Sequence, residues 1–367
     1  MKVSRLSFEG FRNLQTGSYE PCEGVNIIVG ENAQGKTNIL EALWLFTGTK
    51  SFRSAKDKEM IAFGAEQSLL KMDFFAADRQ QEAQIQIINR RVATLNGIKQ
   101  TSPTKLAGVF CGVVFSPAHL SLIKGSPAER RKLIDAAFCQ LHPSYIQSLS
   151  EYARVLEQRN ALCKTRTGGE AVEEMMDLWD RQLAQSGCKI IHARRKYLYR
   201  LSPIARQIYQ GICSGKEEFD IRYASSVEFL KEETPAEIAV HLYNSLREHR
   251  KADFSAGFTT VGPHRDDMDI YIGGNAAKNF GSQGQQRSAV LAIKLAEAAL
   301  LEEVTGEKPI ALLDDVMSEL DRSRQEYILN HIKDWQVFIT CCDPSPLSAL
   351  KSGKTVVVSG GKLSTKE

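Results

Sequence analysis

One short segment near the N-terminus has the residue types and spacing of a phosphate-binding loop. A mostly apolar run at 25–29 precedes it, a helical pattern at 38–46 follows it, and the segment itself consists of Gly30, Glu31, Asn32, Ala33, Gln34, Gly35, Lys36 and Thr37. Its glycines permit a tight turn that exposes backbone N–H groups to phosphate oxygens, and the positive end of the next helix points toward the same anion. We expect Lys36 to contact the β- and γ-phosphates and Thr37 to ligate Mg²⁺. A glycine turn that binds nothing is the alternative, and the flanking strand and helix disfavour it.

Two adjacent carboxylates near the C-terminus supply a second element of phosphate chemistry. The apolar run at 309–313 predicts a buried parallel strand, and Asp314 and Asp315 follow it, at the end of the strand where ligands collect in open α/β sheets. We expect Asp314 to hold Mg²⁺ and Asp315 to polarise an attacking water. The alternative is that the two carboxylates only cap the next helix.

A polar loop at 280–287 precedes a helical pattern at 288–303, and such a loop at a helix N-terminus is a second anion site. The loop resembles the signature loop of the ABC-type ATPases, since Ser282, Gly284 and Gln285 match that pattern, whereas Gln283 stands where a second glycine is usual. Residues 318–321 resemble the loop that follows the acidic strand in the same superfamily. The resemblance implies a head-to-tail homodimer in which the signature loop of each subunit completes the ATP site of the other.

The last apolar run, at 336–340, ends in Cys341, Cys342 and Asp343. ABC transporters usually carry a histidine beside this aspartate. A thiol cannot replace the imidazole as a donor to the γ-phosphate, so we expect slow hydrolysis. The same departure disfavours an ABC transporter subunit.

Length and composition constrain what surrounds these motifs. The 367 residues carry a formal net charge of +3, so binding of nucleic acid would depend on local basic patches. No apolar run approaches the roughly 18 residues of a membrane span, and no secretory signal begins the chain. We therefore expect a cytoplasmic protein with no membrane contact, whose eight cysteines are reduced.

The order of the motifs predicts a discontinuous domain. The expected fold is α/β: an ABC-type P-loop ATPase head formed by residues 1–115 and 256–367, with a helical lobe inserted at 116–255. The lobe begins with a capping box at 126–129, in which Ser126 caps the helix, Pro127 takes its first position and Glu129 closes the box. Breaks in its helices are expected at Pro143, at 167–169 and at Ser202 with Pro203, so the lobe is too short and too interrupted for a long coiled coil.

One stretch of this lobe is strongly basic. Residues 181–216 contain no Asp or Glu and interleave tyrosines with arginines and lysines, a composition that suits a DNA backbone. The residues we expect to contact DNA, in the lobe and near the first helix, are Arg53, Lys56, Arg130, Arg131, Arg194, Arg195 and Arg200. The alternative is a solvated helix face whose tyrosines lie in the core.

The whole chain resembles the RecF family of bacterial recombination and repair ATPases. The segments that carry the resemblance are 8–13, 30–37, 50–53, 114–117, 125–131, 262–267 and the signature and acidic motifs. The resemblance suggests a place for Arg12 beside the nucleotide, with an ion pair as the alternative. His264 and Arg265 also lie in a segment that carries the resemblance. A structural turn, in which Arg265 pairs with Asp266 or Asp267, is an equal alternative to a functional role for these two residues.

The resemblance also implies a function. Family members are ATP-dependent DNA-binding dimers with weak, DNA-stimulated ATPase activity. They bind single-stranded and gapped or linear double-stranded DNA, act with RecO and RecR to help load RecA, and serve replication restart and SOS induction. The rival hypothesis is the ATPase subunit of a membrane transporter, which the basic lobe disfavours. The short insert disfavours a structural organiser, and the signature loop disfavours a small-molecule kinase.

Overall fold

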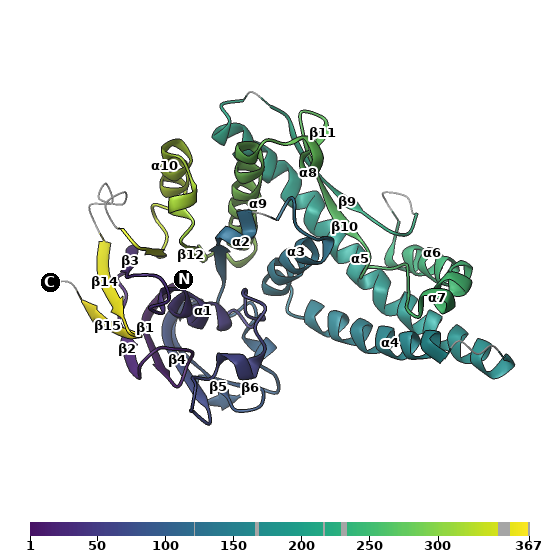
Figure 1. The fold of residues 1–367 in the computed structure, drawn as a ribbon, viewed down its shortest axis with the longest axis horizontal. Coiled ribbons are helices and arrows are strands. Elements are labelled where there is room, and N and C mark those ends of the chain that lie inside the picture. Colours follow the sequence, from purple (N-terminus) through teal and green to yellow (C-terminus); the bar gives the residue numbers. More distant parts are fainter. Residues whose placement is uncertain (121, 166–168, 216, 229–232, 344–352, 366–367) are drawn as a thin grey trace. The chain divides into compact units, whose positions relative to one another are not determined.

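The computed structural model describes residues 1–120, 122–165, 169–215, 217–228, 233–343 and 353–365. The chain divides into two compact units (Figure 1). Unit 1 comprises residues 1–121, 207–217 and 283–367, and unit 2 comprises residues 122–206 and 218–282. The prediction placed the insert at 116–255, whereas the second unit extends to residue 282. The end of its long helix, from residue 207, belongs to the first unit.

Unit 1 contains two six-stranded sheets. The first has the order β2-β1-β4-β5-β6-β7 and is antiparallel; its strands are β1 (Lys2–Glu9), β2 (Gly17–Tyr19), β4 (Ser68–Ala76), β5 (Arg79–Ile87), β6 (Arg91–Leu95) and β7 (Ile98–Lys99). Buried and exposed residues alternate along β4 and β5, as expected for a sheet with one face on the core.

The second sheet has the order β15-β14-β3-β13-β12-β8, and its neighbours pair in parallel except at β15. Its strands are β3 (Val25–Val29), β8 (Gly112–Phe115), β12 (Ile310–Asp314), β13 (Val337–Cys341), β14 (Gly353–Ser359) and β15 (Lys362–Thr365). Every residue of β8, β12 and β13 is buried, the pattern of strands covered on both faces. This parallel sheet positions the candidate site.

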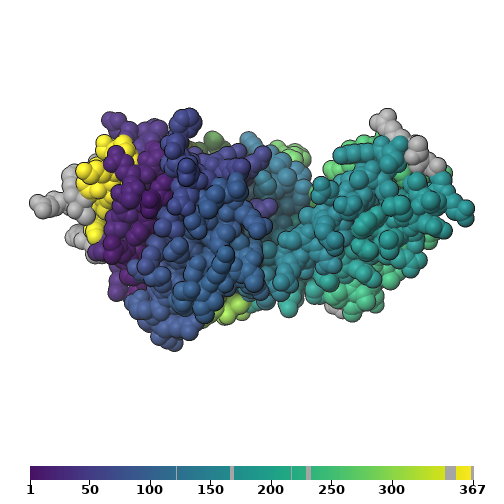
Figure 2. All heavy atoms as spheres, turned by 90° about the horizontal axis from the view of Figure 1, so that it is seen from below, coloured from purple at the N-terminus to yellow at the C-terminus, as the bar shows by residue number. Residues whose placement is uncertain are grey.

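The helices of unit 1 include the one that follows the phosphate loop and the one that follows the signature loop. They are α1 (Lys36–Leu45), α2 (Pro117–Leu120), α9 (Gln283–Thr305) and α10 (Arg322–His331), with short 3-10 helices at Asp57–Met60, Pro103–Leu106 and Met317–Glu319. The two ends of the chain lie side by side in this unit: the Gln15 N–H donates to the Gly361 carbonyl at 2.9 Å, and Figure 2 shows the first strands next to the last ones.

Unit 2 is mainly helical. Its elements are α3 (Pro127–Leu141), α4 (Tyr145–Thr165), α5 (Glu170–Ile212), α6 (Pro235–Glu248), α7 (Arg250–Ala256), α8 (Ala277–Phe280) and a three-stranded sheet of β9 (Phe219–Ala224), β10 (Asp267–Ile272) and β11 (Asn275–Ala276). The capping box of Ser126 and Glu129 is confirmed, as is the break at Pro143. The break expected at Pro203 is wrong, because α5 continues through that residue. The break expected at 167–169 lies largely outside the described residues.

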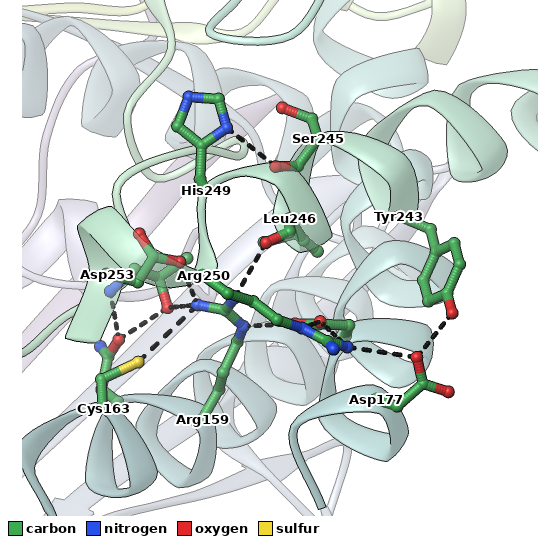
Figure 3. A network of polar contacts seen from close by, with 12 residues as sticks. Arg159, Cys163, Asp177, Tyr243, Ser245, Leu246, His249, Arg250 and Asp253 are labelled. Carbon is green, nitrogen blue, oxygen red and sulfur yellow. Dashed lines mark hydrogen bonds and ion pairs between the residues drawn. The ribbon is translucent and has the colours of Figure 1, made fainter. Parts of the chain in front are cut away.

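A buried ionic network holds the helices of unit 2 together (Figure 3). Arg159 of α4 is fully buried and donates to Asp180 of α5 and Asp253 of α7, each at 2.6 Å. Arg250 donates to the second oxygen of Asp180 at 2.7 Å. Because every charged group in this set has an oppositely charged partner, burial does not leave an isolated charge.

Candidate nucleotide-binding site

The site is assembled at the carboxyl edge of the parallel sheet. The phosphate loop follows β3, Asp314 ends β12 with Asp315 directly after it, and Cys342 follows β13. The order β3-β13-β12 makes these three strands neighbours, so motifs from opposite ends of the chain meet at one edge.

The backbone of the phosphate loop explains its small residues. Gly35 has a φ of +112° and Ala33 one of +65°, in the left-handed region that glycine adopts without strain. Gly30 is required for space, since a Cβ there would lie 2.4 Å from the Val358 carbonyl oxygen of β14. Helix α1 begins at Lys36, so the last two residues of the loop form its start. Its first N–H groups therefore face the loop, as an anion site requires.

Lys36 lies folded into the loop. Its side chain is 4% exposed, and its Nζ donates to the carbonyl oxygens of Gly30 at 2.7 Å and Glu31 at 3.0 Å. Nζ also lies 3.3 Å from Cys342 Sγ, and this thiol donates in turn to Asn32 Oδ1 at 3.2 Å. The ammonium group is therefore held at the centre of the loop, where a phosphate oxygen could accept from it.

The Thr37 hydroxyl donates to Asp314 Oδ1 at 2.7 Å, although the two residues are 277 positions apart. Thr340, at the end of β13, donates to the same oxygen at 3.0 Å and accepts from the Asp315 N–H at 2.9 Å. Burial raises the pKa of Asp314, and the two threonine hydroxyls oppose that shift. The predicted metal ligands are thus in contact.

Sequence reasoning did not single out Thr340, or Asn13 as a contact of the loop. Asn13 Nδ2 donates to the Ala33 carbonyl at 2.9 Å. The signal for Thr340 was its place in the last strand: it stands opposite Asp314 in the parallel pairing of β12 with β13. Asn13 belongs to the segment 8–13 that carries the family resemblance, but nothing in the sequence indicated its bond to the loop.

Arg12 forms the ion pair that was the alternative to a nucleotide contact. Its Nε and Nη2 donate to the two carboxylate oxygens of Glu41 at 3.0 and 2.9 Å, and its Nη1 donates to the Glu59 carbonyl at 2.7 Å. Glu41 is fully buried in α1. Arg12 therefore links the phosphate-loop helix to the segment after β1, next to Asn13.

The signature residues lie where the two units meet in sequence. Ser282 is the last residue of unit 2, and Gly284 and Gln285 lie in the first turn of α9 in unit 1. Gln285 donates to Glu217 at 2.6 Å, and the Gly284 carbonyl accepts from Arg324 at 3.1 Å.

Two of the predicted DNA contacts are wrong, because their side chains are buried and paired. Arg130 is 3% exposed and donates through Nε and Nη2 to Asp267, each at 2.7 Å. Arg194 is 4% exposed and donates to Asp135 at 2.9 and 2.8 Å. The sequence could not show this pairing, since the carboxylates come from distant segments.

The other predicted DNA contacts differ in exposure. Arg131 is half-buried and donates to the Asp266 carbonyl at 2.7 Å, whereas Arg53 and Lys56 are exposed. Arg195 and Arg200 of α5 are half-buried. Of the interleaved tyrosines, Tyr197 and Tyr209 are buried and Tyr199 is 84% exposed.

Comparison with known proteins gives the same family as the motifs. A family model described as the RecF/RecN/SMC N-terminal domain matches residues 2–362. The DNA replication and repair protein RecF of Clostridium perfringens is 39% identical over 343 residues, 93% of each chain. That of Clostridium kluyveri is 38% identical over 99% of this chain and 100% of the relative.

Solved structures agree. A structure of the recombination mediator protein RecF with ATP, described as acting in the RecFOR pathway, is 35% identical, with a TM-score of 0.92 over 100% of this chain and 98% of that one. An Smc head bound to the winged-helix domain of ScpA is 17% identical with a TM-score of 0.56, which shows a shared fold. The predicted α/β ATPase-head fold is confirmed. Among the described residues, no helix has both the length and the apolar character for crossing a membrane. The family-model match and the identity to these relatives show that the chain belongs to the RecF family of DNA replication and repair proteins.

Proposed function

We propose that this protein is an ATP-dependent DNA-binding protein of recombinational repair, which binds ATP with Mg²⁺ and closes into a homodimer. The observation that carries the proposal is the 2.7 Å contact of Thr37 with Asp314, which brings the phosphate loop and the acidic strand into one site. The family supports the repair role, and the solved relative in complex with ATP supports the ligand.

The side chains at the contact fit a hydrated magnesium ion. Asp314 is 8% exposed and its pKa is raised by burial, so a cation would stabilise its charged form. A hydroxyl and a carboxylate are oxygen ligands of the kind that Mg²⁺ prefers. When bound, the ion would neutralise charge on the phosphate oxygens.

The chain's own groups provide the remaining chemistry. Lys36 donates to the phosphates, the N–H groups at the start of α1 surround them, and Asp315 polarises the attacking water. Asp315 has a φ of +49°, and its N–H is held by Thr340, so its position is set by the end of β13. Because Cys342 precedes Asp343 where transporters carry histidine, hydrolysis should be weak.

In the proposed dimer, Ser282, Gly284 and Gln285 of each subunit contact the nucleotide of the other. Phosphates neutralised from both sides hold the dimer closed, and loss of the γ-phosphate removes part of that contact. Single-stranded, gapped or linear duplex DNA is the proposed ligand of the dimer. The proposed DNA contacts retained are Arg53, Lys56, Arg131, Arg195 and Arg200. RecO and RecR are the proposed protein partners in loading RecA. Replication restart and SOS induction are the processes that we propose the protein serves.

The test is fluorescence anisotropy of a labelled gapped duplex, titrated with protein in ATP, in ADP and without nucleotide, at two salt concentrations. We expect ATP to strengthen binding and salt to weaken it, because phosphate contacts release counterions. Lys36→Ala should lose ATP binding and the ATP effect together, by tenfold or more. DNA binding that is absent in every state would contradict the proposal, and normal ATP affinity of Lys36→Ala would contradict the site.

A further inference from the structure

The signature helix is held by a side chain that lies outside every recognised motif. Glu217 stands in the connection between α5 and β9, and its Oε1 accepts from Gln285 Nε2 at 2.6 Å. Both residues belong to unit 1. The contact therefore lies within one compact unit and joins residues 68 positions apart.

The carboxylate of Glu217 is fixed from a second side. Its Oε2 accepts from the Tyr209 hydroxyl at 2.8 Å, and Tyr209 is fully buried near the end of α5. Burial raises the pKa of Tyr209, so the phenol stays protonated and keeps donating. A carboxylate that accepts on both oxygens has little freedom to turn away from Gln285.

The end of α5 is itself anchored to α10. The Tyr327 hydroxyl donates to the Ile208 carbonyl at 3.3 Å, and Gly211 approaches so closely that a Cβ there would lie 2.4 Å from the Tyr327 oxygen. Helix α10 also carries Arg324, which donates to the Gly284 carbonyl at 3.1 Å and to the Ser288 hydroxyl at 2.8 Å. The end of α5, the start of the signature helix α9 and helix α10 are thus joined in a closed ring of contacts.

From this ring we infer that Glu217 is a positioning residue for Gln285: it fixes the orientation of the signature amide that meets the nucleotide of the partner subunit. The inference rests on the proposed function. The bond from Gln285 Nε2 to Glu217 is one of the contacts that set the direction of this amide, and therefore of its Oε1. The negative charge also lies at the N-terminal turn of α9, where it is favourable. Without Glu217 the amide keeps fewer contacts in the monomer, so part of its ordering must occur as the dimer forms, which weakens association.

The test compares four variants with the wild type. Glu217→Ala removes both hydrogen bonds. Glu217→Gln loses the charge and one of the two acceptor oxygens, but its remaining oxygen can still accept from Gln285. Tyr209→Phe releases the second oxygen of Glu217. Glu218→Ala is the matched control, because Glu218 is the next residue and is exposed.

Two quantities are measured with a slowly hydrolysed ATP analogue: nucleotide affinity under conditions that keep the protein monomeric, and the dimer dissociation constant by sedimentation. We expect Glu217→Ala to bind nucleotide like the wild type and to raise the dimer dissociation constant about tenfold, because the Gln285 side chains of both subunits then lose conformational freedom on association. Glu217→Gln should stay within about threefold of wild type, and Glu218→Ala should be unchanged. A purely structural role would lower the thermal midpoint and leave the dimer constant of the folded protein unaltered.

The outcomes separate this inference from the proposed function. A wild type that binds the analogue and remains monomeric contradicts the proposed dimer. A wild type that dimerises, together with a Glu217→Ala variant that dimerises as Glu218→Ala does, overturns the role of Glu217 alone. If Glu217→Ala does not fold, Glu217→Gln and Tyr209→Phe decide: a dimer constant about threefold higher in Tyr209→Phe supports positioning, and an unchanged one overturns it. A Glu217→Gln dimer as weak as Glu217→Ala would also overturn it, because charge rather than orientation would then be responsible.

Discussion

The thiol of Cys342 occupies an unusual position for a cysteine. It is exposed, yet its sulfur lies 3.3 Å from Lys36 Nζ at the centre of the phosphate loop. Five of the other cysteines, Cys111, Cys139, Cys163, Cys188 and Cys341, are buried. Burial raises the pKa of Cys341 to about 11, which keeps that neighbouring thiol protonated and unreactive. Thiol chemistry at this edge of the sheet should therefore be selective for Cys342.

This selectivity gives a chemical test of the site. Alkylation of Cys342 with a maleimide places a bulky group against Lys36, so we expect ATP affinity to fall tenfold or more. Bound ATP should slow the alkylation, measured by mass spectrometry of the peptide that contains Cys342. The control is Cys342→Ser, which should bind ATP normally and keep its affinity after the same treatment. Equal loss of affinity in Cys342→Ser would show that another thiol is responsible.

At the scale of single residues, much of the site was predictable because its chemistry is encoded in short segments. The phosphate loop, Asp314 and Asp315 could be assigned from residue types and strand patterns, and the structure brings Thr37 and Asp314 together. What could not be predicted is which charges are paired. Arg194 looked like a free cation in a basic stretch, but its partner Asp135 comes from another helix, and hydrogen bonding between distant residues leaves no local pattern.

At the scale of elements, the segment 262–267 is a structural junction. Tyr223 and Ser226 donate to Asp266, Arg130 donates to Asp267, and His264 is bonded on both ring nitrogens. Arg265 does not pair with the neighbouring acids: it donates to the Thr259 carbonyl and lies over the Phe258 ring. The structural alternative considered from the sequence thus accounts for the turn, although its expected ion pair is wrong.

This junction should make stability depend on pH. Burial lowers the pKa of His264 from 6.5 to about 4, so between these values the unfolded chain takes up a proton that the folded one does not. The stabilising contribution is complete above pH 6.5 and is lost as the pH falls through 4. Between pH 7.5 and 4.5, the unfolding free energy measured with urea should fall by about 2 kcal/mol less in His264→Gln than in the wild type.

The comparison with a variant is needed because His119 acts in the same direction, its pKa being lowered to about 3 by burial and by Lys294. If His264→Gln keeps the pH dependence of the wild type, the ring of His264 is not the group that resists protonation.

Element boundaries show where sequence patterns are weak. The capping box at Ser126 predicted the start of α3 correctly, because its hydrogen bonds are local. Pro203 was expected to break a helix, but α5 continues over Glu170–Ile212, so the packing of this helix outweighs one lost hydrogen bond. Strand β9 was not predicted in a lobe expected to be helical, and its partner β10 lies beyond the expected end of that lobe at 255; their pairing joins residues 43 to 53 positions apart.

At the scale of the whole molecule, the signature residues are the proposed point where one subunit meets another. Ser282 is exposed and directly precedes α9. The proposed ATP site of the same subunit is formed by other segments, at the ends of β3, β12 and β13. A head-to-tail dimer uses each surface once per subunit, so that two identical sites close together. A change at Ser282 should therefore affect association without affecting the ATP site of its own subunit.

Ser282→Arg tests this arrangement. The long side chain would occupy the space that the partner's phosphates need, so we expect ATP to bind the monomer with unchanged affinity while ATP-driven dimerisation falls by at least tenfold. Sedimentation with ATP and titration with a fluorescent ATP analogue measure the two quantities. Ser4→Arg, at an exposed serine of β1, controls for added charge and should dimerise normally.

Mixing Ser282→Arg with Lys36→Ala extends the test. A mixed dimer would pair the intact signature of Lys36→Ala with the intact phosphate loop of Ser282→Arg, and one composite site would stay functional. Dimerisation of Ser282→Arg alone at the wild-type level would contradict the head-to-tail arrangement.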